Sequence, residues 1–464
     1  MTAANCSNVT FDEIEVGKGL TLSRAMTNTE VEALALVSGE VDPYHVEPGA
    51  LTHTGLPVAQ GVGAEAIISG LLNRRMPGPG TRILSQSLAF DGVIRVGEEI
   101  VATVTPREKR DGRIVVFECT VDASGRRVAT GTVTVEAPKQ RIAYDEIATP
   151  QIILRHNDAF THLLKRCEGI QPVTCAIVHP CDRDSLLGPL EAARRKLIVP
   201  VLVGPEAKIR ATAEAEKVDI SAYRIVDAEH SHAAAQCAVA MARAGEVEAL
   251  MKGSLHTDEL MAAVVPSATG LRTERRISHA FVLDVPAYPH PLIVTDAAIN
   301  IFPDLEAKVD IVQNAIDLAR VFGVETPKVA ILSAVETINP KIQSTPDAAA
   351  LCKMADRGQI TGGILDGPLA FDNAISEEAA KTKKIVSPVA GKADILLMPN
   401  LEAGNMVAKQ LQYLAGADSA GIVLGTRVPI VLTSRADNVR ARLASAAVMA
   451  LVANAKRAKS ALGA

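Results

Sequence analysis

The chain has 464 residues, a formal net charge of −5, 48% hydrophobic and 22% charged residues, and only 3% aromatic residues with no tryptophan. This composition gives no electrostatic case for a nucleic-acid partner and makes base-stacking platforms unlikely candidates for function. No apolar run approaches the roughly 18 residues of a membrane span, and the N-terminus lacks a secretory signal pattern. The seven cysteines contain no CxxC pair, which favours reduced thiols over disulfides or a metal site. We therefore expect a soluble, cytoplasmic protein that contacts no membrane and holds no metal.

The first 140 residues have the pattern of an antiparallel sheet around one helix. Alternating apolar and polar residues predict strands at 100–105, 113–121 and 128–136. Asp111-Gly112 and Ser124-Gly125 supply the hairpin turns between them. Residues 61–72 are almost uninterruptedly apolar and predict a buried helix. We predict an α+β domain at residues 1–140, followed by a linker at 141–156.

After residue 157 the pattern changes to strand, loop and helix in repetition, which predicts an α/β fold. The predicted strands are short continuous apolar runs at 174–178, 199–204, 249–251, 280–283, 292–294, 329–332, 364–365 and 395–398. The predicted helices lie at 233–244, 305–321, 347–357, 404–416 and 439–458. Such runs suit strands that are buried on both faces. About 300 residues exceed one compact core, so we predict two lobes.

The stretch 429–437 combines a short buried strand with three polar groups that can carry chemistry. Ser434, Arg435 and Asp437 follow the strand within a few positions. In an open α/β sheet, groups beyond the carboxyl end of a strand face the ligand crevice. A serine and an arginine there can hold an oxyanion or a phosphate, and the carboxylate can accept a proton. The alternative is a helix start with Ser434 as N-cap and Asp437 at N3.

Other polar clusters lie beside the predicted strands of the larger part. Gly253 permits a ligand or another backbone segment to approach the chain closely. Ser254 and Thr257 can cap a helix whose N-terminus binds an anion. Each cluster alone is also compatible with an ordinary turn or cap. Because such clusters recur, we predict that they converge on one crevice and bind phosphate or a ligand of similar charge. The predicted binding residues are Gly253, Ser254, His256, Thr257, Arg275, Arg276, Asp296, Asp366 and Asn405.

These clusters resemble the phosphate acetyl/butyryltransferase family in order and spacing over roughly residues 150–464. The most specific runs are Ser-Pro-Val-Ala-Gly-Lys-Ala-Asp at 387–394 and Asn-Leu-Glu-Ala-Gly-Asn at 400–405. The resemblance implies an isocitrate/isopropylmalate-dehydrogenase-like fold of two α/β lobes within 157–464. The implied lobe one covers about 157–290 and 430–464, and lobe two covers about 291–429.

The family reaction implied by the resemblance is acyl-CoA plus phosphate to acyl phosphate plus coenzyme A, with no metal and no bound cofactor. It implies that Arg435 binds the phosphate or stabilises the negative charge that develops in the transition state. It also implies that Ser434 binds the acyl or oxyanion oxygen. In the acetyl branch the presumed base lies seven positions beyond the serine, where this chain has Ala441. Asp437 is therefore our candidate base. A nucleotide-dependent decarboxylating dehydrogenase on the same fold is the alternative reading.

Residues 38–47 resemble the signature of MaoC-type enoyl-CoA hydratases, and 57–62 resembles the motif before the central helix of their hot-dog fold. The resemblance implies water addition to a trans-2-enoyl-CoA. Glu40 stands at the position of the family's catalytic Asp, and His45 at that of its His. A non-catalytic acyl-CoA-binding or dimerisation module is the alternative. Both families are usually homo-oligomeric, so we expect a homo-oligomer.

Overall fold

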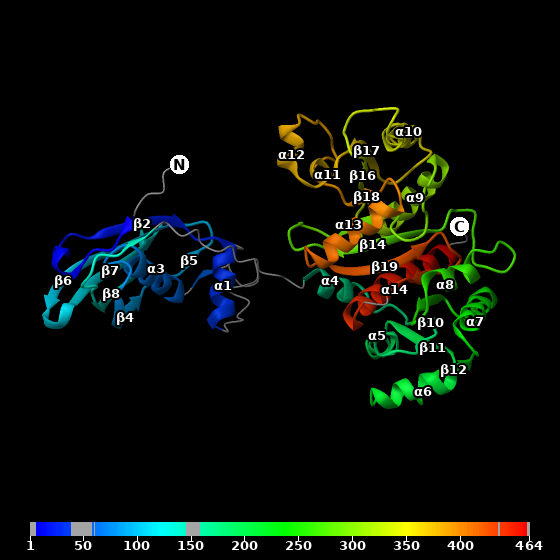
Figure 1. Cartoon of the computed structure of the whole chain (residues 1–464), viewed down its shortest axis with the longest axis horizontal. Helices are drawn as coiled ribbons and strands as arrows, with labels where there is room; N and C mark the ends of the chain where they lie inside the picture. The colour runs from blue at the N-terminus through cyan, green and yellow to red at the C-terminus, as the bar shows by residue number, and fades with distance from the viewer. Residues whose placement is uncertain (1–5, 39–57, 60, 145–157, 435–436, 462–464) are drawn as a thin grey trace. The chain divides into compact units, whose positions relative to one another are not determined.

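The computed structural model divides the chain into two compact units, Met1–Arg155 and His156–Ala464 (Figure 1). It describes residues 6–38, 58–59, 61–144, 158–434 and 437–461. Each unit has its own hydrophobic core, so each is described by itself.

The smaller unit contains a five-stranded antiparallel sheet. Its strands, in sheet order, are β2 (Leu20–Ala25), β6 (Glu99–Arg110), β7 (Ile114–Ala123), β8 (Arg126–Glu136) and β4 (Arg82–Phe90). The three strands predicted from alternation are β6, β7 and β8, and all three are confirmed. Gly112 and Gly125 lie in the two predicted hairpin connections with φ of 74° and 77°. Glycine adopts this left-handed region without a steric penalty, so the connections can be tight.

Helix α3 (Gly61–Arg74) is the predicted buried helix and packs against this sheet. Its residues Ile67, Ile68, Leu71 and Leu72 are buried in one core together with Phe117 of β7. Each such side chain contributes roughly 1.5–3 kcal/mol on burial. The smaller unit is thus a sheet wrapped on one helix, as a hot-dog fold requires. Its remaining elements are β1 (Cys6–Ser7), η1 (Phe11–Glu13), α1 (Asn28–Ser38), β3 (Val58–Ala59), β5 (Ile94–Arg95), η2 (Asp111–Arg113) and β9 (Ala143–Tyr144).

The larger unit is built on one continuous sheet of eleven strands within the described residues. In sheet order they are β12 (Arg224–Asp227), β11 (Ile198–Gly204), β10 (Val173–Val178), β13 (Ala249–Lys252), β20 (Ile430–Val431), β19 (Asp418–Leu424), β14 (Ser278–Asp284), β15 (Leu292–Thr295), β18 (Ile395–Leu397), β16 (Lys328–Leu332) and β17 (Ile364–Leu369). All eight strands predicted from apolar runs are confirmed. The sequence pattern did not reveal β12 or β19.

Helices flank this sheet, and all five predicted ones are present (Figure 1). They are α4 (Asp158–Arg166), α5 (Arg183–Arg194), α6 (Glu206–Ala215), α7 (Ser231–Ala244), α8 (Thr257–Val264), α9 (Leu305–Val321), α10 (Ser344–Asp356), α11 (Phe371–Ile375), α12 (Glu377–Thr382), α13 (Leu401–Tyr413) and α14 (Val439–Ala461). Helix α14 buries Ala446, Val448 and Met449 completely and packs on α5 and β19. It thereby ties the end of the chain to the middle of the sheet.

The strands of the larger sheet run in two opposite directions. β10, β11, β12, β13 and β20 are mutually parallel. β19 is antiparallel to β20, and β14 is antiparallel to both β19 and β15. The set β15, β18, β16 and β17 therefore runs opposite to the first set. The prediction that all strand-end clusters meet at one edge is wrong, because the carboxyl ends of the two sets lie at opposite ends of the sheet.

An ion pair joins α14 to the residue before β13. Arg457 donates from Nε and Nη2 to the two carboxylate oxygens of Glu248, at 2.6 Å each, and Glu248 also accepts from Thr174. The hydrogen bond from Arg457 is the main cause that lowers the pKa of Glu248 from 4.5 to about 2. A lowered carboxyl pKa stabilises the fold above pH 4.5, and this stabilisation is lost as the pH falls toward 2.

We expect Glu248→Gln to reduce the unfolding free energy at pH 7 by about 1 kcal/mol or less, because solvent screens a pair that is partly exposed. Thermal unfolding of both proteins between pH 7 and pH 3 should show the difference shrinking below pH 4.5. Glu246→Gln is the matched control, since Glu246 is exposed and lies 3.4 Å from Arg224. A difference that stays constant over this range would contradict the linkage.

Candidate active site

The turn between β20 and α14 holds Ser434 by its backbone. The Ser434 N–H donates to Oδ2 of Asp437 at 2.7 Å, and Asp437 N–H donates to the Ser434 carbonyl at 3.1 Å. Lys252 Nζ donates to the carbonyl of Thr433 at 3.2 Å. Arg435 lies outside the described residues. The serine therefore sits in a turn whose peptide groups are bonded to charged side chains.

The structure excludes Ser434 as the N-cap of α14. The helix begins at Val439, and Oδ1 of Asn438 accepts from the N–H of Ala441 at 3.0 Å. Asn438 is thus the capping residue, and the predicted helix-cap alternative for Ser434 is wrong. The predicted helix start at residue 439 is confirmed, and only the alternative cap fails, because serine and asparagine are comparable capping residues.

Asp437 is buried, with 4% of its surface exposed. Its Oδ1 accepts from Gln412 Nε2 of α13 at 3.1 Å, and Gln412 also donates to Ser419 of β19 at 3.0 Å. The carboxylate is therefore fixed between α13, β19 and the Ser434 turn. A buried carboxylate that is oriented by neutral donors retains lone pairs for a reacting proton.

Gly253 and Ser254 follow β13, which lies directly beside β20 and parallel to it. A Cβ at Gly253 would lie 2.4 Å from the Val178 carbonyl, so the predicted close backbone approach is confirmed. Ser254 Oγ donates to the His179 carbonyl at 2.8 Å and accepts from Cys181 N–H at 3.2 Å. Residues 253 and 254 and Ser434 therefore extend neighbouring parallel strands at the same end of the sheet.

Helix α8 begins at Thr257, and its N-cap is His256 rather than the predicted Ser254 or Thr257. The His256 N–H donates to Oε2 of Glu259 at 2.8 Å, as in a capping box. The N-terminus of α8 follows β13 after a short loop, so its dipole is oriented toward that end of the sheet. The predicted helix start near Thr257 is therefore confirmed, but the capping residue is His256.

Asp296 belongs to a buried network that was not predicted as such. Its Oδ2 accepts from His279 N–H at 3.2 Å and from Asn300 Nδ2 at 2.6 Å, and Asn300 Oδ1 accepts from Arg276 Nε at 2.8 Å. His279 is fully buried, and its Nε2 lies 3.5 Å from the carbonyl of Leu432. Burial lowers the pKa of His279, against the opposing effects of Asp296 and Asp437. His279 thus links this network to the strand that leads to Ser434.

Asn405 and Asp366 lie on other elements. Asn405 of α13 donates to the Ala297 carbonyl at 3.2 Å, next to Asp296. Asp366 is on β17, and its Oδ1 accepts from Gly367 N–H at 2.9 Å. β17 is six strands away from β20, which is about 29 Å at ordinary strand spacing. The structure therefore does not bring Asp366 beside Ser434.

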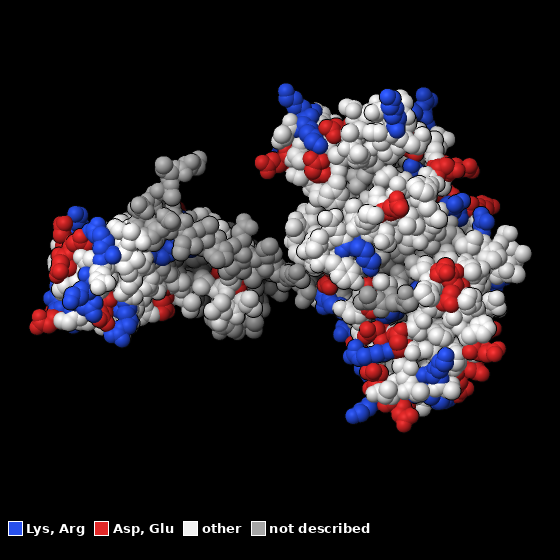
Figure 2. Space-filling view, viewed as in Figure 1, with Lys and Arg blue, Asp and Glu red and all other residues white. Residues whose placement is uncertain are grey.

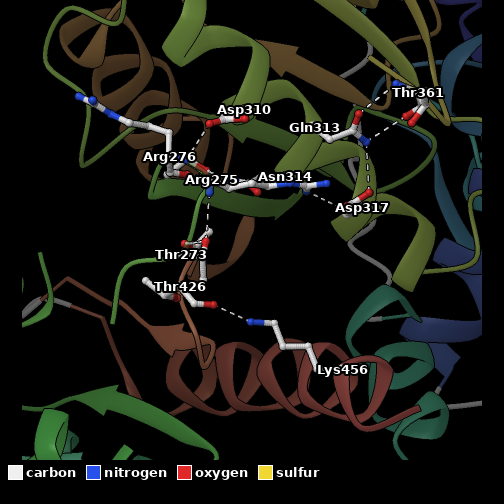
Figure 3. Close-up of polar contacts among 12 residues, drawn as sticks. Thr273, Arg275, Arg276, Asp310, Gln313, Asn314, Asp317, Thr361, Thr426 and Lys456 are labelled. Atoms are coloured by element: carbon white, nitrogen blue, oxygen red, sulfur yellow. Dashed lines mark hydrogen bonds and ion pairs between the residues drawn. The ribbon is translucent and has the colours of Figure 1, made fainter. Parts of the chain in front are cut away.

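Arg275 lines a separate cavity of about 530 Å³ at the beginning of β20 (Figure 3). Its Nη1 donates to Oδ2 of Asp317 at 2.6 Å, and Lys456 Nζ donates to the carbonyl of Thr426 at 2.7 Å across the same cavity. Arg442 lies in the first turn of α14, at the end of the helix that is near Ser434. Lys456 lies fourteen residues further along this helix, which is about 21 Å from Arg442 along the helix axis. Arg275 is therefore not grouped with Ser434, contrary to the single-crevice prediction.

Charged side chains of both signs are interspersed on the face of the larger unit in Figure 2. Among the helices that the structure describes, none is long and apolar enough to cross a membrane. The described residues contain no group of three His, Cys, Asp or Glu side chains that could hold a metal ion.

Comparisons with known proteins identify relatives of both parts of the chain. Residues 232–450 match the family model described as "Phosphate acetyl/butaryl transferase", and residues 13–126 match "MaoC like domain". A phosphate acetyltransferase of Rhizobium meliloti is 63% identical over 299 residues, covering 64% of this chain and 95% of that protein. A phosphate butyryltransferase of Clostridium beijerinckii is 40% identical over 294 residues, covering 63% of this chain and 97% of that protein.

Among solved structures, a branched-chain phosphotransacylase from Enterococcus faecalis V583 is 29% identical with a TM-score of 0.54. The match covers 61% of this chain and 99% of that one. The larger unit is therefore an acyltransferase domain of the α/β class. The chain belongs to the phosphate acetyl/butyryltransferase family and carries a MaoC-like hot-dog domain before it. The dehydrogenase alternative finds no support in these comparisons.

Proposed function

We propose that the larger unit transfers an acyl group between coenzyme A and inorganic phosphate, giving acyl phosphate and free coenzyme A reversibly. A phosphate oxygen attacks the thioester carbon, the C–O bond forms, and the C–S bond breaks. The thiolate of coenzyme A then takes a proton. The observation that carries this proposal is the 63% identity to a phosphate acetyltransferase over 95% of its length.

In this proposal Ser434, Arg435 and Asp437 form the reacting centre. Ser434 donates a hydrogen bond to the acyl oxygen, on which negative charge develops in the tetrahedral intermediate. Arg435 holds the phosphate by its guanidinium. Asp437 exchanges the proton with the sulfur of coenzyme A. The hydrogen bonds from Lys252 and to Asp437 hold the backbone at Ser434 in place. They support these roles because they orient the backbone of the proposed site before substrate binds.

We further propose that the segment after β13 binds phosphate or the phosphates of coenzyme A. It lies beside the Ser434 turn on a parallel strand, and α8 begins there. Backbone N–H groups at a helix N-terminus favour anions. The proposed contributors are Gly253, Ser254, His256 and Thr257. For Arg276, Asp296 and Asn405 we propose a supporting role through the His279 network.

We propose that the larger unit has the two-lobed arrangement of isocitrate/isopropylmalate dehydrogenases, with lobe one at 157–290 and 430–464 and lobe two at 291–429. The common direction of β15, β18, β16 and β17 supports a separate second lobe. By these bounds β19 belongs to lobe two, and it lies in the sheet between two strands of lobe one, β14 and β20. A domain boundary in the linker 141–156 completes the proposal.

The proposed reaction is tested with the full chain and a series of acyl-CoA substrates from acetyl to hexanoyl. Release of the coenzyme A thiol is followed with and without phosphate. We expect phosphate-dependent thiol release with at least one substrate of the series. Thiol release that is independent of phosphate, or none with the whole series, would refute the proposal.

We propose a second activity for the smaller unit, water addition to a trans-2-enoyl-CoA. The match to the MaoC-like domain over residues 13–126 favours it. Glu40 and His45, the proposed catalytic pair, lie outside the described residues. Loss of absorbance of crotonyl-CoA in water with the full chain, abolished in His45→Ala, is the expected result. Binding of crotonyl-CoA without turnover would instead identify an acyl-CoA-binding module.

We propose that the protein is a cytoplasmic homo-oligomer. Helix α13 and its C-cap residue present Met406, Tyr413 and Leu414 to solvent, and each residue is 61–80% exposed. Their spacing of seven and eight residues places them on one helix face, which suits a contact with a second copy. Light scattering of the full chain should give a multiple of 48.8 kDa. A monomeric mass at micromolar concentration would contradict the proposal.

A further inference from the structure

Arg442 is the largest of the fully buried side chains that the structure describes, with 1% of its surface exposed. It lies in the first turn of α14, close to the Ser434 turn. Burying a guanidinium costs free energy unless its charge is balanced and its N–H donors form hydrogen bonds. The other arginines of α14, Arg440 and Arg457, are partly exposed and ion-paired, so the environment of Arg442 differs from theirs.

The donors of Arg442 bind the ends of two parallel strands. Nη1 donates to the carbonyl of Lys252 at 3.2 Å and to Thr433 Oγ1 at 3.0 Å, and Nη2 donates to the carbonyl of Ser434 at 3.4 Å. All three acceptors are uncharged oxygens. Nε has no partner among the described residues. The side chain thus bridges the end of β13 and the turn after β20.

The surrounding elements leave space for this side chain. A Cβ at Gly188 of α5 would lie 2.8 Å from Cβ of Arg442 and 2.9 Å from its Cδ. Only glycine at this position lets the aliphatic stem of Arg442 pass between α5 and α14. Burial is the main effect on its pKa and lowers it, while the carboxylates of Asp182, Asp437 and Asp184 oppose this from a distance.

Three charged side chains together fix both peptide groups that flank Ser434. Lys252 donates to the Thr433 carbonyl, Arg442 donates to the Ser434 carbonyl, and Asp437 accepts from the Ser434 N–H. The peptide before the serine and the peptide after it are therefore both held. These two planes set the direction of the Cα–Cβ bond of Ser434.

We propose that Arg442 is a positioning residue for acyl transfer, which sets the orientation of Ser434. The inference rests on the proposed function. Arg442 acts through Ser434 and need not touch substrate. Displacement of a reacting group by about 1 Å can reduce a rate about 100-fold. Loss of the bridge should therefore reduce kcat more than it weakens acyl-CoA binding.

The test measures kcat and both KM values for Arg442→Met, Arg442→Lys and Arg457→Met in the full chain. Arg457 is the matched control, because it lies on the same helix and binds Glu248 and two carbonyls far from Ser434. We expect Arg442→Met to lower kcat at least about tenfold with the KM for acyl-CoA within about threefold. Arg442→Lys should recover part of the loss, and Arg457→Met should change only the melting temperature.

A further variant guards against failure of Arg442→Met to fold. Gly188→Ala keeps every charge but displaces Arg442, so it should also lower kcat and leave the KM for acyl-CoA within the same range. Equal kcat in wild type, Gly188→Ala and Arg442→Lys would overturn the inference, as would equal losses in Arg442→Met and Arg457→Met. Absence of phosphate-dependent turnover in the wild type would instead refute the proposed function.

Discussion

Replacing Arg435 with alanine is expected to lower kcat for acyl transfer about 100-fold or more, equivalent to about 2.7 kcal/mol in the barrier. Arg435 directly follows Ser434, whose peptide groups are held by Lys252 and Asp437. A guanidinium beside that serine meets the charge that develops on phosphate and on the acyl oxygen. Removing it leaves the charge unbalanced in the transition state.

The measurement is phosphate-dependent thiol release at saturating acyl-CoA, with Arg427→Ala as control. Arg427 is an exposed arginine before β20, at the opposite end of that strand from Ser434. We expect its replacement to leave kcat within about twofold, as surface substitutions usually do. Near-normal turnover of Arg435→Ala would remove Arg435 from the reacting centre.

Replacing Asp437 with asparagine is expected to lower kcat about 100-fold or more, as loss of a general acid or base does. Asparagine retains an acceptor for the Ser434 N–H, and rotation of the Gln412 amide accommodates its new donor. Asn and Asp thus differ mainly in the ability to take a proton. The measurement is kcat at saturating acyl-CoA and phosphate over a range of pH values.

Asp418→Asn is the corresponding control, because Asp418 is a nearby carboxylate that is ion-paired with Arg440. Its replacement should leave the pH profile unchanged. If Asp437→Asn retains most of the rate while Asp437→Ala loses it, Asp437 serves only to hold Ser434, and another group moves the proton. The two substitutions together therefore separate proton transfer from positioning.

In the larger unit, the strands that were predicted from the sequence are those with continuous apolar runs, since burial on both faces requires them. β19 was not predicted because its sequence, Asp-Ser-Ala-Gly-Ile-Val-Leu, begins with polar and small residues. Gly421 is needed there because a Cβ would lie 2.4 Å from the Leu432 carbonyl. Close contact with a neighbouring strand, which no local pattern records, explains this composition.

The parts of the site that depend on the order of residues along the chain could be predicted from the sequence. The parts that depend on the order and direction of the strands in the sheet could not. Ser434 and the residues after β13 lie at one end of the sheet because two parallel strands are neighbours. Asp366 has the same local pattern but lies on a strand of the opposite direction. Arg442 was not predicted as a site residue, since a single sequence cannot distinguish a solvated arginine from a buried one.

The antiparallel pair β14 and β19 restricts how the two halves of the larger unit can move. Its ladder runs from Ser278 opposite Leu424 to Asp284 opposite Asp418 and forms the middle of an unbroken sheet. Hinge rotation about a flexible loop would break these hydrogen bonds, whereas a change in twist spreads small dihedral adjustments over many strands. Relative motion of the two halves would therefore twist the sheet without breaking this ladder, and the many paired strands limit the amplitude of such motion.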